Sequence, residues 1–264
     1  MGTSKGDYMR NFFKSAGIIV AITVIGFSMT GCPTDDDGDP PAHLGPRLEL
    51  SGRVYMEVYN EEDWSISYSP FNGNLATTGG GRTGNITNGR LTHAIETPDF
   101  LQRFSDAPWF FEDYFWDFEI VTVSNTGVRF YILGLDVDSD DFWGPIRRNY
   151  SESRRGNSFS SSQDDVMYLF VDNDVILNGR GKTDTWTSDE GGFTFNSTTT
   201  SRDFNLSLRA GWNALHIRRS GSGTFTGTPP NFTSITGTST VRVSLSNPSL
   251  RWVLGRAYDD DWDD

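Results

Sequence analysis

The 264-residue sequence is poor in cysteine, in basic residues and in histidine, and each shortage excludes a class of site. A single Cys excludes an internal disulfide framework and any zinc site built from cysteines. Only 22 Lys and Arg stand against 35 Asp and Glu, which gives a formal net charge of −13 at pH 7. Because phosphate binding needs a basic surface, this balance argues against nucleic acid as a partner.

Catalytic motifs are also missing. Of the three His residues, His93 and His216 fall in expected strands, where we interpret them as packing residues. No Gly-x-Ser-x-Gly or His-Glu-x-x-His motif occurs, and the phosphate-loop-like Gly179–Thr183 (GRGKT) has Ile176 where that motif requires Gly. We therefore expect no cofactor and no enzyme activity. A hydrolase that uses a pair of carboxylates stays open, because sequence does not give the distance between acids.

The N-terminus contains an apolar run that is too short to be a membrane helix. Residues Ala16 to Met29 are uncharged and follow Lys5, Arg10 and Lys14. Those 14 residues fall short of the roughly 20 that a transmembrane helix needs. The pattern is typical of a signal peptide, which we place at residues 1–31.

The only Cys lies at the predicted cleavage point. Met29-Thr30-Gly31-Cys32 resembles a bacterial lipobox, with Met29 where Leu is usual. The resemblance implies that Cys32 carries acyl chains such as palmitate, which would attach the exported protein to a lipid bilayer of the cell envelope. We expect the outer membrane, on its periplasmic or surface face, rather than the inner membrane. The alternative is a free buried Cys behind an ordinary signal peptide.

Acidic residues concentrate at the two ends of the mature chain. A spacer at residues 32–45 holds Asp35, Asp36, Asp37 and Asp39, and a tail at residues 257–264 holds five more aspartates. Removal of the signal peptide, with three basic residues and one acid, leaves a net charge of −15. Since these ends carry −9 of it, the body has only −6 and no focused acidic cleft is expected. We interpret the spacer as an extended, solvated tether.

The body has the pattern of an all-β protein made of antiparallel strands. Alternating or continuous apolar runs recur between Gly, Asn and Ser clusters, which favours a β-sandwich. Examples are Leu48–Tyr59, Phe118–Val123 and Val166–Val171, and Asn88-Gly89 predicts a hairpin turn. We predict one sandwich unit at 46–140, a polar linker loop at 141–163 and a second unit at 164–256. One composite sandwich is the alternative.

One aromatic segment departs from this strand pattern. Seven of the ten residues from Trp109 to Phe118 are aromatic, and Pro108 is suited to a first helical turn. A helix of two to three turns would turn Phe111, Tyr114, Phe115 and Phe118 inward. Trp109 and Trp116 would then face outward as candidate ligand-binding residues. The alternative is a helix that only closes one end of the sandwich.

A few polar clusters are candidate metal ligands or turns. Asp136, Asp138 and Asp140 have the spacing of a calcium loop, but the positions that require Gly and Glu hold Asp141 and Arg147. We expect these acids to begin a solvated loop, with no metal bound. Asp172-Asn173-Asp174 predicts a tight turn, and Gly211-Trp212-Asn213 predicts a turn whose Trp packs on the core.

Several short motifs resemble those of uncharacterised lipoproteins of the treponeme type from spirochaetes, over nearly all of the mature chain. The motifs are Leu50–Tyr55 (LSGRVY), Tyr68–Asn74 (YSPFNGN), Gly84–Leu91 (GNITNGRL) with Thr97-Pro98, Tyr168–Val175 (YLFVDNDV), Ala210–Asn213 (AGWN) and Ser246–Leu250 (SNPSL). The first half is also similar, through turn motifs, to prealbumin-type modules of the carboxypeptidase-regulatory kind. These resemblances imply a lipoprotein with a β-sandwich, and they assign no functional residue.

Together, these observations predict a membrane-anchored, non-enzymatic lipoprotein with an envelope structural or surface-binding role. Its expected partners are the bilayer, through Cys32, and a glycan or protein ligand. The main alternative is a carbohydrate-binding module, because sugar faces stack on exposed aromatic rings. The candidates for such stacking are Trp64, Trp109, Trp143, Trp186 and Trp212.

Overall fold

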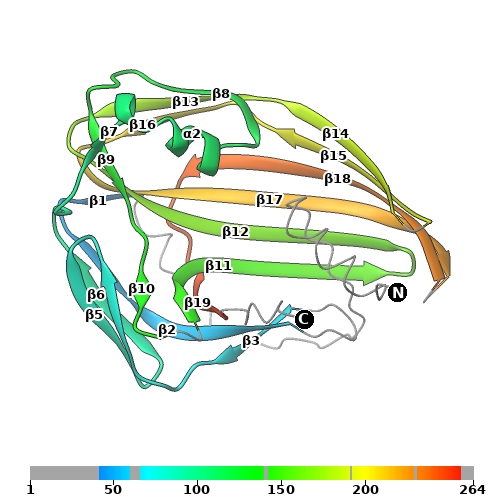
Figure 1. Ribbon diagram of the computed structural model, residues 1–264, viewed down its shortest axis with the longest axis horizontal. Helices are drawn as coiled ribbons and strands as arrows, with labels where there is room; N and C mark the ends of the chain where they lie inside the picture. The colour runs from blue at the N-terminus through cyan, green and yellow to red at the C-terminus, as the bar shows by residue number, and fades with distance from the viewer. Residues whose placement is uncertain (1–41, 60–65, 140–141, 191, 229–230, 257–264) are drawn as a thin grey trace, which may run out of the picture.

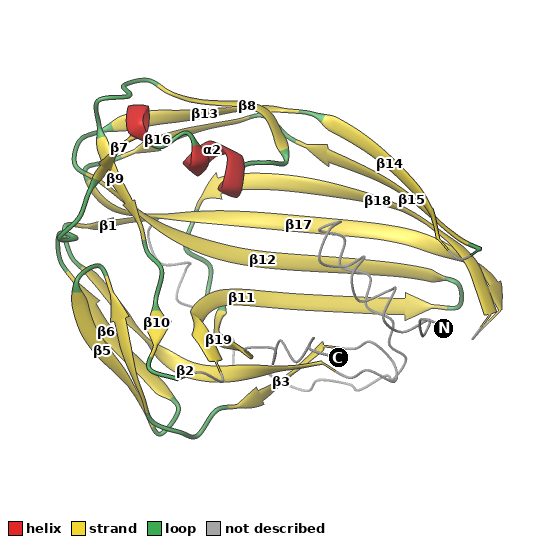
Figure 2. Cartoon of the chain, viewed as in Figure 1, coloured by secondary structure: helices red, strands yellow, loops and turns green. Residues whose placement is uncertain are grey.

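The protein is built almost wholly of strands, as the sequence predicts. The computed structural model describes residues 42–59, 66–139, 142–190, 192–228 and 231–256. Within these ranges only two short helical segments interrupt the strands (Figure 2). The predicted class, an all-β sandwich of mainly antiparallel strands, is confirmed.

The strands vary from two to eighteen residues in length. In chain order the elements are β1 His43–Gly45, β2 Leu48–Tyr59, β3 Ile66–Pro70, β4 Leu75–Gly79, β5 Arg82–Thr87, β6 Arg90–Ile95, β7 Gln102–Arg103, the 3₁₀ turn η1 Phe104–Asp106, α2 Trp109–Tyr114, β8 Phe118–Val123, β9 Arg129–Ile132, β10 Asp136–Val137, β11 Phe142–Arg155, β12 Ser158–Val171, β13 Val175–Gly181, β14 Thr183–Glu190, β15 Phe193–Ser201, β16 Phe204–Leu208, β17 Gly211–Thr228, β18 Asn231–Leu245 and β19 Arg251–Arg256.

In the described ranges, sixteen strands form one large sheet and three form a small one. The large sheet has the main order β10-β4-β5-β6-β2-β19-β11-β12-β17-β18-β15-β14, and the small sheet has the order β16-β13-β8. Figure 1 shows β11, β12, β17 and β18 as long strands that run side by side and extend well past the small sheet. The chain therefore makes one wide, curved sheet with a smaller sheet packed near one end.

The second half of the central strand β12, Val166–Val171, is buried on both faces, which explains its continuous apolar run. Leu169 and Val171 belong to a first core, and Tyr168 and Phe170 belong to a second core on the opposite face. The first core is closed by the small sheet and the α2 segment, through residues such as Phe110, Phe115, Leu177, Leu206 and Leu208. The second core is closed by β2, β5 and β6, through residues such as Leu48, Leu50, Val54, Ile86, Leu91 and Ile95.

The predicted linker at 141–163 is wrong for its described residues, which start at 142. They form the hairpin β11–β12, paired from Arg147 with Val166 to Arg155 with Ser158. Gly156 at the turn has a φ of +61°, and the Ser153 and Ser160 hydroxyls lie 2.8 Å apart across the strands. Backbone ladders to neighbours on both sides stabilise this serine-rich stretch without an apolar alternation that the sequence would reveal.

The two predicted sandwich units are also not separate sheets. The last strand, β19, lies between β2 of the first predicted unit and β11, pairing in parallel with β2 and antiparallel with β11. Trp252 and Leu254 on β19 lie in the same core as Leu50 and Leu91. Of the two arrangements considered from the sequence, the observed pairing agrees with the composite sandwich.

The local predictions of strands and turns are mostly right. The expected ranges Leu48–Tyr59 and Phe118–Val123 match β2 and β8 residue for residue. Asn88 and Gly89 have φ values of +49° and +71°, as a tight hairpin turn of the primed type requires.

The aromatic helix is shorter than predicted, and its buried face is only partly the predicted one, since Phe115 and Phe118 are buried as expected. α2 covers only six residues, and Phe118 already begins β8. Phe110 is completely buried, whereas Tyr114, which we expected inside, is 39% exposed. Asp117, just before β8, is buried. The 3.6-residue period does not continue past Tyr114, because residues 115–117 form a turn and β8 begins at Phe118.

Candidate functional sites

The predicted lipid anchor cannot be placed in the fold. Cys32, the signal peptide and most of the spacer lie outside the described residues, as does the acidic tail. Among the described residues, no helix is long and apolar enough to cross a membrane. Anchoring through Cys32 therefore remains a prediction from the sequence.

The two candidate ligand-binding tryptophans are both at the surface. Trp109 is 37% exposed and Trp116 is 49% exposed, and Tyr114 lies beside Trp109 with ring centroids 6.4 Å apart. We call Trp109, Tyr114 and Trp116 the aromatic surface.

A rigid aromatic cluster lies directly beneath this surface. Phe110 packs against Phe104, Phe115 and Phe130 at centroid distances between 4.8 and 5.4 Å. Phe104 and Phe130 stack at 4.3 Å with an interplanar angle of 10°. The buried rings fix the segment in place, so the exposed rings are held in position rather than collapsed onto the core.

The other candidate tryptophans divide into buried, exposed and undescribed. Trp212 is fully buried, and its Nε1 donates to the Glu96 carbonyl at 2.9 Å, so it packs on the core as predicted. Trp186 on the edge strand β14 is 38% exposed. Trp64 and the side chain of Trp143 lie outside the described residues. In the described part, exposed tryptophan is therefore found at the aromatic surface and on β14.

The calcium-like aspartates do not come together as a site. Asp136 lies in β10 and Asp138 follows it, donating its backbone N–H to the Ala76 carbonyl; both are exposed, and Asp140 lies outside the described residues. Among the described residues, no group of three or more His, Cys, Asp or Glu is placed to hold a metal ion.

The aspartates of the predicted 172–174 turn serve structural bonds. Asp172 accepts from Arg129 Nε at 2.7 Å, and Asp174 accepts from the Ala210 backbone at 2.8 Å. Burial raises the pKa of Asp172, but hydrogen bonds from Arg129 and Asn173 outweigh it, so the pKa lies below its usual value. The turn is thus hydrogen-bonded to the chain at both Arg129 and Ala210.

A chain of alternating charges crosses four elements of the structure, and we call it the charge row. It consists of Glu57, Arg148, Asp165, Arg219 and Asp117. Arg148 Nε lies 2.7 Å from Asp165, and Arg219 bridges Asp165 at 3.6 Å and Asp117 at 3.0 Å. Side chains alternate between the two faces of a strand, so Arg148, Asp165 and Arg219 lie on the face of the large sheet that also carries the first core.

Two acids of the charge row, Glu57 and Asp117, have a pKa that burial raises. Burial raises the pKa of Glu57, with Arg148 acting against the shift and Asp165 adding to it. Burial likewise raises the pKa of Asp117, although Arg219 opposes it. For Arg148, burial acts to lower the pKa, but Asp165 and Glu57 raise it above its usual value. The carboxylates are therefore matched by arginines, as in a structural ion network.

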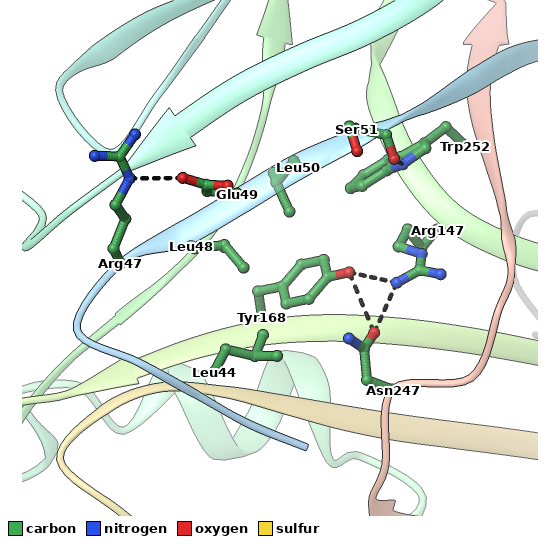
Figure 3. A pocket seen from close by; sticks show the side chains of 10 residues that line it. All are labelled: Leu44, Arg47, Leu48, Glu49, Leu50, Ser51, Arg147, Tyr168, Asn247 and Trp252. Carbon is green, nitrogen blue, oxygen red and sulfur yellow. Dashed lines mark hydrogen bonds and ion pairs between the residues drawn. The ribbon is translucent and has the colours of Figure 1, made fainter. Parts of the chain in front are cut away.

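A pocket of about 450 Å³ lies on the other face, beside the start of the folded body (Figure 3). Apolar side chains contribute to its walls, Arg47 and Glu49 form an ion pair of 3.0 Å on its exposed side, and polar groups from distant strands meet at its base. Its lining residues are Leu44, Arg47, Leu48, Glu49, Leu50, Ser51, Arg147, Tyr168, Asn247 and Trp252.

Arg147 organises the base of this pocket. Its Nη1 donates to the Tyr168 hydroxyl at 2.7 Å and to Asn247 Oδ1 at 2.6 Å, and its Nη2 donates to the Pro248 carbonyl at 2.9 Å. Its guanidinium also lies 5.7 Å from the centre of the Trp252 ring. Burial raises the pKa of Tyr168 in spite of Arg147, so the phenol stays neutral.

Sequence reasoning missed both the pocket and the charge row. Arg147 was assessed only as a failed calcium ligand, and Arg148 and Asp165 lay in or next to the expected linker. Both features join residues that are distant in the chain, for instance Arg147 and Asn247, 100 positions apart. The one local signal was Ser246–Leu250 (SNPSL), whose Pro248 favours an irregular backbone with free carbonyls.

Comparison with known proteins finds no family model, no curated protein and no solved structure that matches this chain.

Proposed function

We propose that the protein is a lipid-anchored binding protein of the cell envelope and not an enzyme. The anchor rests on the order of features before the body: a basic segment, an apolar run, the sole Cys32 and an acidic spacer. Ala42, the first described residue, follows Cys32 by ten positions, and ten extended residues span at most about 35 Å. The tether would therefore keep the sandwich close to the bilayer.

The observation that carries the binding role is the exposure of the aromatic surface. Trp109, Tyr114 and Trp116 each keep more than a third of their surface in solvent, while Phe110 and Phe115 of the same segment are buried. Large exposed aromatic side chains on a rigid base are typical of binding surfaces. The buried aromatic base thus keeps these three rings accessible to a binding partner.

The charges beside the aromatic surface favour a neutral or basic partner. Glu112 and Asp113 are exposed within α2, next to Trp109 and Tyr114. Anionic lipid headgroups would be repelled by these acids, whereas a sugar or a basic protein would not. The pairing of the charge row's carboxylates with arginines supports a binding role over acid–base catalysis.

Carbohydrate binding is the second candidate, and exposed tryptophan favours it specifically. Sugar faces stack on indole rings, and both Trp109 and Trp116 are accessible. A glycan array probed with the purified body should give millimolar or tighter binding if the ligand is a sugar. Binding only to a protein from the same envelope would instead favour a protein as the partner of the aromatic surface.

A double variant, Trp109→Ala with Trp116→Ala, tests the site for either partner. We expect it to lose binding at least tenfold while its melting temperature changes little, because both rings are exposed. Trp186→Ala on β14 is the matched control, since Trp186 has an exposure of 38%, close to that of Trp109. Loss of binding in the control alone would assign the site to β14 and refute the aromatic surface.

A further inference from the structure

Arg147 is a partly buried cation whose hydrogen-bond acceptors among the described residues are all neutral. Arg148 and Arg219 lie within 4 Å of carboxylates, but in the described ranges Arg147 has none. Its acceptors are the neutral oxygens of Tyr168, Asn247, Pro248 and Leu250. A partly buried cation without a counter-charge is electrostatically costly, and an anion nearby would relieve that cost.

The hydrogen bonds at the pocket base leave a donor turned toward the cavity. Asn247 is 6% exposed, and its Oδ1 accepts from Arg147 and, at 3.4 Å, from Tyr168. Its Nδ2 has no acceptor among the described residues. Figure 3 shows the amide oxygen turned to Arg147 and Tyr168, with the nitrogen on the side of Leu44. This orientation is fixed, because a flipped amide would set Nδ2 against the guanidinium.

The pocket's size and walls limit what fits it. About 450 Å³ suits a molecule of roughly monosaccharide size. Leu44, Leu48 and Leu50 supply apolar wall, and the cationic base favours the charged end of an amphipathic ligand. Glu49 lies on the exposed side in an ion pair with Arg47, so its charge is largely compensated.

We propose that this pocket binds a small organic carboxylate, whose anion accepts from Asn247 Nδ2 beside the Arg147 guanidinium. The ligand's body packs against the leucines of the wall. The site is distinct from the aromatic surface, so it goes beyond the proposed function and does not depend on it. A binding failure of the Trp109 and Trp116 variants would leave this site intact.

Two matched pairs of probes test the chemical class. Isothermal titration calorimetry of the purified protein would compare D-glucuronate with D-glucose, and hexanoate with 1-hexanol. We expect at least one carboxylate to bind with a millimolar or tighter Kd and its uncharged counterpart to bind at least tenfold more weakly. No binding of either carboxylate at about 10 mM, or equal binding of a neutral counterpart, would overturn the proposal.

Asn247→Asp and Glu49→Gln separate a ligand site from a purely structural clamp. Asn247→Asp keeps an oxygen for Arg147 and Tyr168 but supplies the missing carboxylate from the protein itself. We expect an equal or higher melting temperature and at least tenfold weaker carboxylate binding. Glu49→Gln removes a negative charge from the exposed side, so binding should tighten about twofold to threefold. Unchanged affinity in Asn247→Asp would contradict the assignment.

Discussion

Trp212 packs between segments that are distant from one another in the chain. Its ring meets Phe170 at 5.5 Å and Tyr131 at 6.3 Å, both edge to face. It is the second residue of β17 and follows Gly211, whose φ of +106° and close approach to the Gly45 carbonyl leave no room for a side chain. Two adjacent positions thus combine a special backbone conformation with the largest fully buried side chain of the described residues.

Trp212→Ala should lower the free energy of unfolding by about 3–5 kcal/mol, because it opens a large cavity and leaves the Glu96 carbonyl without its donor. Trp116→Ala, at an exposed position, should change it by less than about 0.5 kcal/mol. Urea unfolding of both variants measures the difference. Equal changes in the free energy of unfolding at the two positions would show that the burial of Trp212 does not stabilise the fold.

His93 makes stability depend on pH in a predictable direction. Burial lowers its pKa despite the hydrogen bond with Gly79, and Thr77 Oγ1 lies 2.8 Å from its Nδ1. The unfolded chain takes up a proton below about pH 6.5, while the folded state resists it, so stability is lost as pH falls below that value. Unfolding free energies from about pH 5 to 7.5 should fall toward acid more steeply in the wild type than in His93→Gln. Identical slopes would contradict this role.

The long strands differ along their length in how well they are buried. Val166–Val171 of β12 lies between the two cores, whereas Ser158–Asp165 is polar apart from a small aromatic patch that includes Phe159 and Phe225. Phe159 packs over Gly223 on the neighbouring strand, where a Cβ would meet its ring. The stability of the Ser158–Asp165 half of β12 therefore depends mainly on backbone hydrogen bonds to the neighbouring strands.

Hydrogen exchange should reveal this gradient within one strand. We expect amides at 166–171 to exchange at least about tenfold more slowly than those at 158–165, because opening of residues 166–171 exposes both cores. Mass spectrometry of peptides that cover each half provides the measurement. Uniform protection along β12 would show that the ladders of residues 158–165 are as stable as the cores.

At the level of elements, apolar alternation determined what could be predicted. β2 alternates buried and exposed residues from Leu48 to Val54, and β8 is rich in aromatic and β-branched residues, so the sequence located both. β11, β14 and the outer halves of β17 and β18 are rich in Ser, Thr, Gly or charge and have little apolar period, so their extent was missed. The missed parts are stabilised by pairing between distant strands, which a local pattern does not encode.

The candidate sites show the same limit. Exposure of Trp109 and Trp116 was predicted from a helical period, although the helix ends before Trp116. The buried face was only partly right, since Phe115 and Phe118 are inside but Tyr114 is not. The Arg147 pocket could not be predicted, because its residues come from β2, β11, β12, β19 and segments beside them.

For the whole molecule, the shared strands β12 and β17 couple the two cores. Leu215 of β17 packs in the first core and Ala214 in the second. A disturbance of either core therefore acts on the same sheet, and separate unfolding of the two predicted units would have to split its ladders.

Leu177→Ala in the first core should shift unfolding that is detected in the second. We expect a loss of about 2–5 kcal/mol and the same midpoint by tryptophan fluorescence, which includes Trp212, as by far-UV circular dichroism. Leu91→Ala in the second core should behave in the same way. Two separate transitions, with fluorescence unaffected by Leu177→Ala, would indicate independent units.

We propose that this β-sandwich acts while it is attached to a membrane through Cys32. Metabolic labelling with palmitate, followed by separation of membrane and soluble fractions, tests it most directly. We expect a labelled wild-type protein in the membrane fraction, and an unlabelled Cys32→Ser variant that is released from membranes. Persistent labelling of Cys32→Ser, or a wild-type protein that carries no label, would contradict it.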